Sequence, residues 1–330
     1  MIKIRSIAEI QEACNPLLAS KKRRFLALAA LPSAVFVLAS CSYAAAVDSI
    51  APPADSASQT QEAVLATGLK FPEGATLSKD RKTFYCVNVQ SSLISRLDLK
   101  TCTFEPAWVT LPDGGRGNGA TIGPDGDLYV CDVVRKLIAR VSTKTGAVET
   151  VVDKDSDGNP FLGPNDITFA RDGSFYFTDP NGSWKKPIGA IYHFVPKTKA
   201  VSRVASELLF PNGLALSPDN LTLYYGESPK GDISTVDLTP NGIVPPGRKS
   251  LLLHIADNAN PDGIRVDSHG YIYAVSFGSA LVVKLSPAGE IVKRYTLVAG
   301  KNATNLALDE KGGVMYVTET QSNSILKLSL

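Results

Sequence analysis

A short phrase recurs six times along this chain, and it constrains the fold more than any other feature. In its clearest copy, Asn165 begins a short run, a turn follows at Arg171-Asp-Gly-Ser, and a second run carries Tyr176. Successive tyrosines in this phrase lie 44, 47, 48, 49 and 43 residues apart, a period typical of repeat architectures. The six copies are Glu73 with Tyr85, Asn118 with Tyr129, Asn165 with Tyr176, Asn212 with Tyr224, Asp262 with Tyr273 and Asn305 with Tyr316.

Each copy alternates apolar and polar residues over short runs that are separated by Gly, Asp, Asn and Pro. This pattern is typical of short antiparallel strands. The second copy contains four such runs, at 119–122, 127–131, 136–141 and 147–152. The 264 residues from 67 to 330 divide into six repeats of 44, which matches the length of a four-stranded propeller blade.

The last copy has only one further run, residues 324–330, after its tyrosine, and an additional run at 62–69 precedes the first copy. An unpaired sheet edge invites aggregation, so we expect the additional run to pair with the last blade. The sequence therefore predicts an all-β protein, a six-bladed β-propeller over residues 61–330. Its blades are four-stranded and antiparallel, and an N-terminal strand in the last blade closes the ring.

The N-terminal region has the features of an export signal. Four basic residues at 21–24 precede an apolar run at 25–39, which is too short for a membrane span and correctly flanked for a secretory signal. Leu38-Ala-Ser-Cys41 resembles a bacterial lipobox, with Cys41 as the lipidated residue; cleavage within 44–46 is the alternative.

We therefore expect residues 1–40 to be a lipoprotein-type signal peptide and residues 41–60 to be a flexible tether. The protein is predicted to be exported, as a periplasmic or cell-envelope lipoprotein of a bacterium. Contact with a membrane is expected only through a lipid anchor at Cys41.

The charge of the chain argues against nucleic acid as a partner. The whole sequence has a formal net charge of +2, and residues 1–40 hold six basic and two acidic groups, so their removal gives 2 − 4 = −2. A nearly neutral protein has no basic field for nucleic acid. We expect a monomer that acts on a small molecule.

Five cysteines are too few and too scattered for a disulfide scaffold. Cys86, Cys102 and Cys131 lie beyond the predicted leader. Cys86 and Cys102 are the pair expected to form a disulfide if one forms, because they belong to neighbouring strands of one blade. Buried free thiols are the alternative. The absence of a Cys-x-x-Cys sequence excludes a zinc or redox motif of that type.

The polar residue that starts each copy predicts a site on the propeller axis. The first strand of every blade lines the central channel, so residues at one phase of the repeat converge there. That phase contains only carboxylates and amides: Glu73, Asn118, Asn165, Asn212, Asp262 and Asn305. Turn capping by Asn and Asp is the alternative, but it does not explain Glu73.

An oxygen-rich set without His or Cys suits a hard divalent cation. Two carboxylates balance its charge. Ca²⁺ is the expected ion; Mg²⁺ and Mn²⁺ are also compatible, and Zn²⁺ is less natural in such a set. The three histidines occupy unrelated phases of the repeat, which argues against a Ser-His-Asp triad.

Four short motifs in order give the chain a resemblance to a known family. The chain resembles the senescence marker protein, gluconolactonase and luciferin-regenerating enzyme family, which includes the regucalcin-like proteins. The motifs are Pro72-Glu-Gly74, Pro164-Asn-Asp166 with Phe177-Thr-Asp-Pro180, Pro211-Asn-Gly-Leu214 with Ser217-Pro-Asp219, and Pro261-Asp-Gly263. The resemblance implies a six-bladed propeller with an axial divalent metal, usually calcium, and the hydrolysis of lactones or related esters.

Carried over residue by residue, the resemblance implies specific roles. The metal-binding positions are Glu73, Asn165, Asn212 and Asp262, and Asp262 is also the catalytic carboxylate, as general base or as nucleophile.

The sequence also suggests supporting roles for other residues near this phase. We expect Asn118 and Asn305 to contact substrate or water. Asp166 is expected either to orient Asn165 or to stabilise a turn. Trp184 and Phe277 are candidates for the pocket rim, with packing between blades as the alternative.

The predicted function is divalent-metal-dependent hydrolysis of lactones, as in gluconolactonases. Two alternatives remain open from the sequence. One is a non-catalytic propeller that serves as a binding platform, since a fold does not fix a function. The other is a metal-dependent hydrolase of organophosphates or other esters.

Overall fold

The computed structural model describes residues 61–180, 182–243, 249–255 and 259–330. The predicted signal peptide, the tether and Cys41 lie outside the described residues. Within the described ranges, no helix has the length and apolarity needed to cross a membrane.

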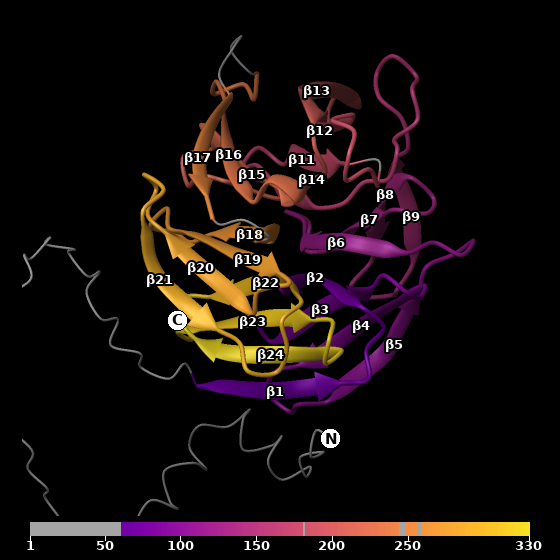
Figure 1. Ribbon diagram of the computed structural model, residues 1–330. Helices are drawn as coiled ribbons and strands as arrows, with labels where there is room; N and C mark the ends of the chain where they lie inside the picture. Colours follow the sequence, from indigo (N-terminus) through magenta and orange to yellow (C-terminus); the bar gives the residue numbers. More distant parts are fainter. Residues whose placement is uncertain (1–60, 181, 244–248, 256–258) are drawn as a thin grey trace, which may run out of the picture.

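The chain forms six four-stranded antiparallel sheets arranged around a central axis (Figure 1). The first blade consists of β2 (Pro72–Leu77), β3 (Thr83–Asn88), β4 (Leu93–Asp98) and β5 (Phe104–Thr110). The second consists of β6 (Gly117–Ile122), β7 (Leu128–Asp132), β8 (Leu137–Val141) and β9 (Val148–Val152). The third consists of β10 (Ile167–Phe169), β11 (Phe175–Asp179), β12 (Gly189–Val195) and β13 (Ala200–Leu208).

The remaining three blades follow the same order from the axis outward. The fourth consists of β14 (Pro211–Leu216), β15 (Thr222–Glu227), β16 (Asp232–Asp237) and β17 (Lys249–His254), with the 3₁₀ turn η1 (Ser228–Lys230). The fifth consists of β18 (Asn260–Val266), β19 (Ile272–Phe277), β20 (Leu281–Leu285) and β21 (Ile291–Thr296). The sixth consists of β22 (Ala303–Asp309), β23 (Val314–Glu319), β24 (Ser324–Ser329) and β1 (Glu62–Thr67). The predicted six-bladed propeller is confirmed.

Strand β1 closes the ring by pairing with the C-terminal strand. It runs antiparallel to β24, along the outer edge of the sixth blade (Figure 1). The carboxylate of Glu62 accepts hydrogen bonds from the backbone N–H groups of Val298, at 2.8 Å, and Ala299, at 2.9 Å. The first strand of the described chain therefore ties together the last two blades and removes a free edge.

The apolar core is divided among the interfaces between blades. Six clusters of buried residues occur, and each joins two neighbouring blades. In one of them, Leu65 of β1 packs with Phe84 of the first blade and Tyr316 of the sixth. Because every blade packs on both neighbours, the ring holds the innermost strands in fixed relative positions.

The expected pairing of Cys86 with Cys102 is wrong. Cys86 and Cys131 are buried free thiols, so the alternative of buried thiols holds for both. Cys86 lies among apolar side chains at the interface between the sixth and first blades, and burial raises its thiol pKa well above the ordinary value. We infer that both thiols serve packing rather than cross-linking.

Truncation of Leu65 to alanine tests the closure by β1. Leu65 is 3% exposed, so Leu65→Ala should lower the free energy of unfolding by about 2–5 kcal/mol through loss of buried surface and a residual cavity. Val298→Ala is the control, because Val298 is 84% exposed and its truncation should change stability by about 0.5 kcal/mol or less. Urea denaturation measures both. Equal effects of the two substitutions would contradict docking of β1 in the ring.

Candidate active site on the propeller axis

The recurring tyrosines allow equivalent positions in the six innermost strands to be aligned. Each tyrosine lies opposite one residue of the innermost strand of its blade: Thr76, Thr121, Thr168, Ala215, Arg265 and Ala307. Counting back three residues from each gives Glu73, Asn118, Asn165, Asn212 and Asp262 in the first five blades, and Thr304 in the sixth. Five of the six residues that the spacing aligned are therefore equivalent.

Asn305 is the exception, because it lies one residue past the axial position of its blade. Ala307 lies nine positions before Tyr316, as Thr76 does before Tyr85, so the equivalent axial position is twelve before the tyrosine, at Thr304. Asn305 lies eleven positions before Tyr316, a spacing that fits only blades in which the paired residue lies eight before the tyrosine, as Thr168 does before Tyr176. The backbone confirms this register. Asn305 N donates to Thr318 Oγ1 at 3.0 Å, as Asp166 N does to Thr178 Oγ1.

Asn305 does not line the cavity described below, and the expected contact with substrate is corrected accordingly. Its Nδ2 atom donates to Glu73 Oε2 at 3.0 Å, and its Oδ1 atom accepts from Leu306 N at 2.9 Å. The side chain is 1% exposed. Asn305 therefore positions the carboxylate of Glu73 from the neighbouring blade.

Glycines allow the innermost strands to approach one another at the axis. Glycine follows the axial residue in four blades, at Gly74, Gly119, Gly213 and Gly263. A Cβ atom on Gly213 would lie 2.0 Å from the carbonyl oxygen of Asp262, which no side chain tolerates. The register of these strands also shifts at this point, and such bulges re-aim side chains near functional sites. The backbone itself therefore directs the axial residues toward a common point.

Five of the axial residues line one cavity of about 230 Å³. Glu73, Asn165, Asn212 and Asp262 are each between 4% and 8% exposed, and Asn118 is half-buried. The complete lining is Phe71, Glu73, Val89, Asn118, Asn165, Trp184, Phe210, Asn212, Ser228, Asn260, Asp262 and Phe277. The structure thus gathers the four expected metal-binding residues and Asn118 in a single place.

Both carboxyl groups of the cavity have a raised pKa, and burial is the main cause for each. Burial raises the pKa of Glu73 from 4.5 to about 7, with the charge of Asp166 as the next cause, while hydrogen bonds from Gly74 N and Asn305 oppose the shift. Burial also raises the pKa of Asp262 well above its usual range, and the charge of Glu73 is the second cause. Two ionised carboxylates at this depth need positive charge beside them.

Asp166 and Arg265 form a buried ion pair next to this cavity. Asp166 occupies the place that glycine takes in four other blades, and its carboxylate accepts from Ile167 N at 2.9 Å and from Arg265 Nη1 at 3.1 Å. The side chains of Asp166 and Arg265 are 2% and 18% exposed. The carboxylate of Asp166 thus contacts the arginine and its own strand, and orientation of Asn165 by Asp166 stays a prediction.

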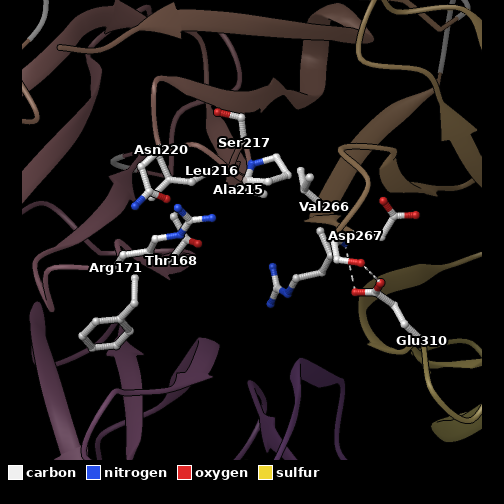
Figure 2. A pocket seen from close by; sticks show the side chains of 13 residues that line it. Thr168, Arg171, Ala215, Leu216, Ser217, Asn220, Val266, Asp267 and Glu310 are labelled. Atoms are coloured by element: carbon white, nitrogen blue, oxygen red, sulfur yellow. Dashed lines mark hydrogen bonds between the residues drawn. The ribbon is translucent and has the colours of Figure 1, made fainter. Parts of the chain in front are cut away.

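Arg265 also lines a second cavity, three residues further along the innermost strands. This cavity, of about 420 Å³, is bordered by Thr168, Ala215 and Arg265. Figure 2 shows Arg171 and Glu310 on opposite sides of it. Arg265 therefore connects this second cavity with Asp166, the neighbour of the axial residue Asn165.

The donor set of the axial cavity fits a hard divalent cation. Two carboxylates and neighbouring amides supply oxygen ligands and two negative charges. The described part of the chain contains no cluster of three or more His, Cys, Asp or Glu side chains that could hold a metal ion, so any metal site here must include amide oxygens. The side chains of Asn118 and Asn165 make no hydrogen bond to described residues, so their oxygens are available.

Two strained phenylalanines of the cavity were not identified from the sequence. Phe71 and Phe210 each lie two residues before an axial residue and are followed by a proline, and their φ angles are 59° and 48°. Left-handed backbone at a bulky residue costs on the order of 1–3 kcal/mol and concentrates at functional sites. The Phe-Pro dipeptide shared by the first and fourth copies was the available signal. Trp184 and Phe277, expected either at the rim or in packing, both line the cavity.

Most of the chain matches a known protein family. Residues 62–321 match the family model described as the SMP-30/Gluconolactonase/LRE-like region. The match covers most of the chain, which therefore belongs to this family.

Distant relatives carry related names. The chain is 28% identical over 223 residues to a gluconolactonase of Zymomonas mobilis subsp. mobilis, covering 62% of this chain and 61% of that protein. It is 25% identical over 242 residues to lactonase drp35 of Staphylococcus epidermidis, covering 60% of this chain and 74% of that protein. A strictosidine synthase-like protein of Arabidopsis thaliana is 30% identical over 218 residues, with 62% and 56% covered. The chain spans about three-fifths of the length of the first of these relatives.

Solved structures share the fold at lower identity. A gluconolactonase of Xanthomonas campestris superposes with a TM-score of 0.72 at 23% identity, covering 84% of this chain and 93% of that one. A calcium-binding regucalcin of Agrobacterium tumefaciens superposes with a TM-score of 0.69 at 20% identity, covering 82% and 94%. These likenesses support the six-bladed architecture.

A double-mutant cycle tests the ion pair beside the cavity. Arg265→Met leaves the carboxylate of Asp166 buried without its partner and should lower the free energy of unfolding by about 3–5 kcal/mol. Adding Asp166→Asn to that variant should recover most of the loss, because the uncompensated charge is removed. Urea denaturation at pH 7 measures the four proteins. Additive effects of the two substitutions would show that the pair is not coupled.

Proposed function

We propose that this protein is a divalent-metal-dependent hydrolase that opens lactones at the axial cavity. The observation that carries the proposal is the pair of buried carboxylates, Glu73 and Asp262, which face a cavity together with amide side chains. A structural core has no use for two like charges at this depth. Family membership and the names of the distant relatives support the same reaction class.

The proposed cation is Ca²⁺, and its ligands would be Glu73, Asn165, Asn212 and Asp262. When bound, the ion supplies a positive charge that polarises the substrate carbonyl and stabilises the oxyanion formed on attack. Hydrogen bonds within the protein fix the positions of two of these ligands. Asn305 holds Glu73 through a hydrogen bond of 3.0 Å, and Ser228 holds Asn212 by accepting from its Nδ2 atom at 3.1 Å.

Asp262 is the proposed catalytic carboxylate. As a general base, it accepts a proton from a water molecule while the water oxygen bonds to the lactone carbonyl carbon. The ring C–O bond then breaks, and the leaving oxygen takes up the proton, so the product is a hydroxy acid. Direct attack by the Asp262 carboxylate, followed by hydrolysis of the acyl enzyme, gives the same product. Asn118, which lines the cavity, would contact the substrate through its side-chain amide.

The location of the protein also stays a proposal. Residues 1–40, as a signal peptide, and Cys41, as the lipidated residue, would place the enzyme in the cell envelope as a lipoprotein.

Two alternative functions were open from the sequence. A metal-dependent hydrolase of other esters or of organophosphates would use the same carboxylates. A binding platform without catalysis has less support, because it does not require Glu73 and Asp262 together.

Removal of the catalytic carboxylate and of the metal tests this proposal. Hydrolysis of a panel of lactones should require added Ca²⁺ and should stop with a chelator. Asp262→Asn should lower kcat/KM by about 10² or more, the usual range for loss of a general base. Asp113→Asn is the matched control, because Asp113 is exposed, lies outside the cavity and has a positive φ that asparagine tolerates. Activity that survives both chelator and Asp262→Asn would refute the axial mechanism.

A further inference from the structure

The outer part of the axial cavity is aromatic, in contrast to its polar inner part. Phe71 and Phe277 lie with ring centroids 6.4 Å apart and an interplanar angle of 29°. Trp184 and Phe210 lie 5.1 Å apart at an angle of 37°. All four line the cavity, and we call them the aromatic rim. Metal binding and proton transfer by the inner residues do not account for these side chains.

The rim is more accessible than the carboxylates. Trp184 is 47% exposed, whereas Glu73 and Asp262 are at most 8% exposed. Large exposed aromatic side chains beside a cavity are typical of ligand-binding surfaces. The strained backbone of Phe71 and Phe210 indicates that the surrounding structure holds these rings at the opening against their local preference.

Several polar groups of the cavity are already engaged with the protein. Ser228 Oγ donates to the carbonyl oxygen of Pro261 at 2.7 Å and accepts from Asn212 Nδ2. Asn260 Nδ2 donates to the carbonyl oxygen of Phe277 at 3.1 Å. A sugar lactone carries several hydroxyl groups on its ring and tail, and many of these would face aromatic carbon without a partner. Burial of unpaired hydroxyl groups is unfavourable, so the rim discriminates against polyols.

The charge of the lining limits the substrate further. Among the described residues that line the cavity, Glu73 and Asp262 are the charged ones, and there is no Lys, Arg or His. A carboxylate or phosphate on the substrate would therefore lack a charged partner at the rim. Anionic groups on the part of the substrate away from the reacting carbonyl are disfavoured, and the aromatic rings favour an apolar group there.

We propose that the substrate is an uncharged lactone with an apolar hydrocarbon substituent, and that the aromatic rim binds this substituent. The inference rests on the proposed hydrolase function and names its substrate class. It predicts a preference for δ-decalactone, which carries a five-carbon tail, over δ-valerolactone and glucono-δ-lactone, which share the six-membered ring but lack the tail.

Steady-state kinetics of the full chain with these three lactones and Ca²⁺ is the first test. The wild-type kcat/KM for δ-decalactone should exceed that for δ-valerolactone by about tenfold or more, since contact with several methylene groups raises transition-state binding. Trp184→Ala and Phe277→Leu should each reduce this ratio several-fold, mainly through a higher KM for δ-decalactone. Leu251→Ala, at a residue 61% exposed outside the cavity, should leave the ratio unchanged.

Fluorescence of Trp184 provides a second test that requires no catalysis. The chain has two tryptophans, so Trp108→Phe leaves Trp184 as the sole reporter. The lactam 6-pentylpiperidin-2-one imitates δ-decalactone but resists hydrolysis, and piperidin-2-one is its analogue without a tail. The tailed lactam should change Trp184 emission saturably, at a concentration at least about tenfold lower than the analogue requires.

The outcomes separate this inference from the proposed function. Two results would contradict binding of a hydrocarbon substituent by the aromatic rim but leave the proposed hydrolase function intact. One is metal-dependent hydrolysis that favours glucono-δ-lactone, and the other is metal-dependent hydrolysis whose rate depends neither on the tail nor on Trp184→Ala. Tail-dependent binding without hydrolysis of any lactone supports the rim and contradicts the hydrolase. A Trp184 signal that does not distinguish the two lactams contradicts the rim.

Discussion

Close backbone contact between the innermost strands is the constraint on which the site depends. Glycine after the axial residue lets each of four strands approach its neighbour more closely than any side chain would allow, as the 2.0 Å between a Cβ on Gly213 and the Asp262 carbonyl oxygen shows. The six apolar clusters hold this arrangement from outside. Side chains from distant parts of the sequence then converge without any loop having to fold over them.

The two blades without glycine at this position are informative. There the chain carries Asp166 and Asn305, and both take part in the electrostatics of the cavity. Asn305 donates to Glu73, while Asp166 pairs with Arg265. Counting formal charges, Glu73, Asp262 and Asp166 contribute −3 and Arg265 contributes +1, so the ionised group carries −2. That charge matches one divalent cation.

The sequence predicted the architecture well because a repeat reports the same local structure six times. Period, turn residues and the additional run at 62–69 sufficed for the blade number and for closure. The axial phase was correct for five blades. It was wrong for Asn305, because the turn before Tyr316 has the longer of the two lengths found in the repeat, whereas a count of eleven residues from the tyrosine fits the shorter one. The spacing of residues along one chain does not reveal which residues of two neighbouring strands pair with each other.

Contacts between blades were beyond the reach of sequence reasoning. Arg265 looks like an ordinary strand residue, and its partner Asp166 lies 99 positions away. The same holds for Phe71 and Phe277, which meet across the cavity from the first and fifth blades. Cys86 and Cys102 were near in sequence, yet Cys86 is a free thiol in an interface with the sixth blade. The local sequence pattern predicts the strands, whereas the packing of the blades in the ring determines which side chains are in contact.

The most direct measurement is a crystal structure of the protein grown with Mn²⁺, with anomalous differences collected to locate the ion. We expect a single strong peak on the propeller axis, with oxygen atoms of Glu73, Asn165, Asn212 and Asp262 among its ligands. A map without a peak in the axial cavity, or with the ion bound elsewhere, would contradict the central claim that these buried carboxylates form a metal site.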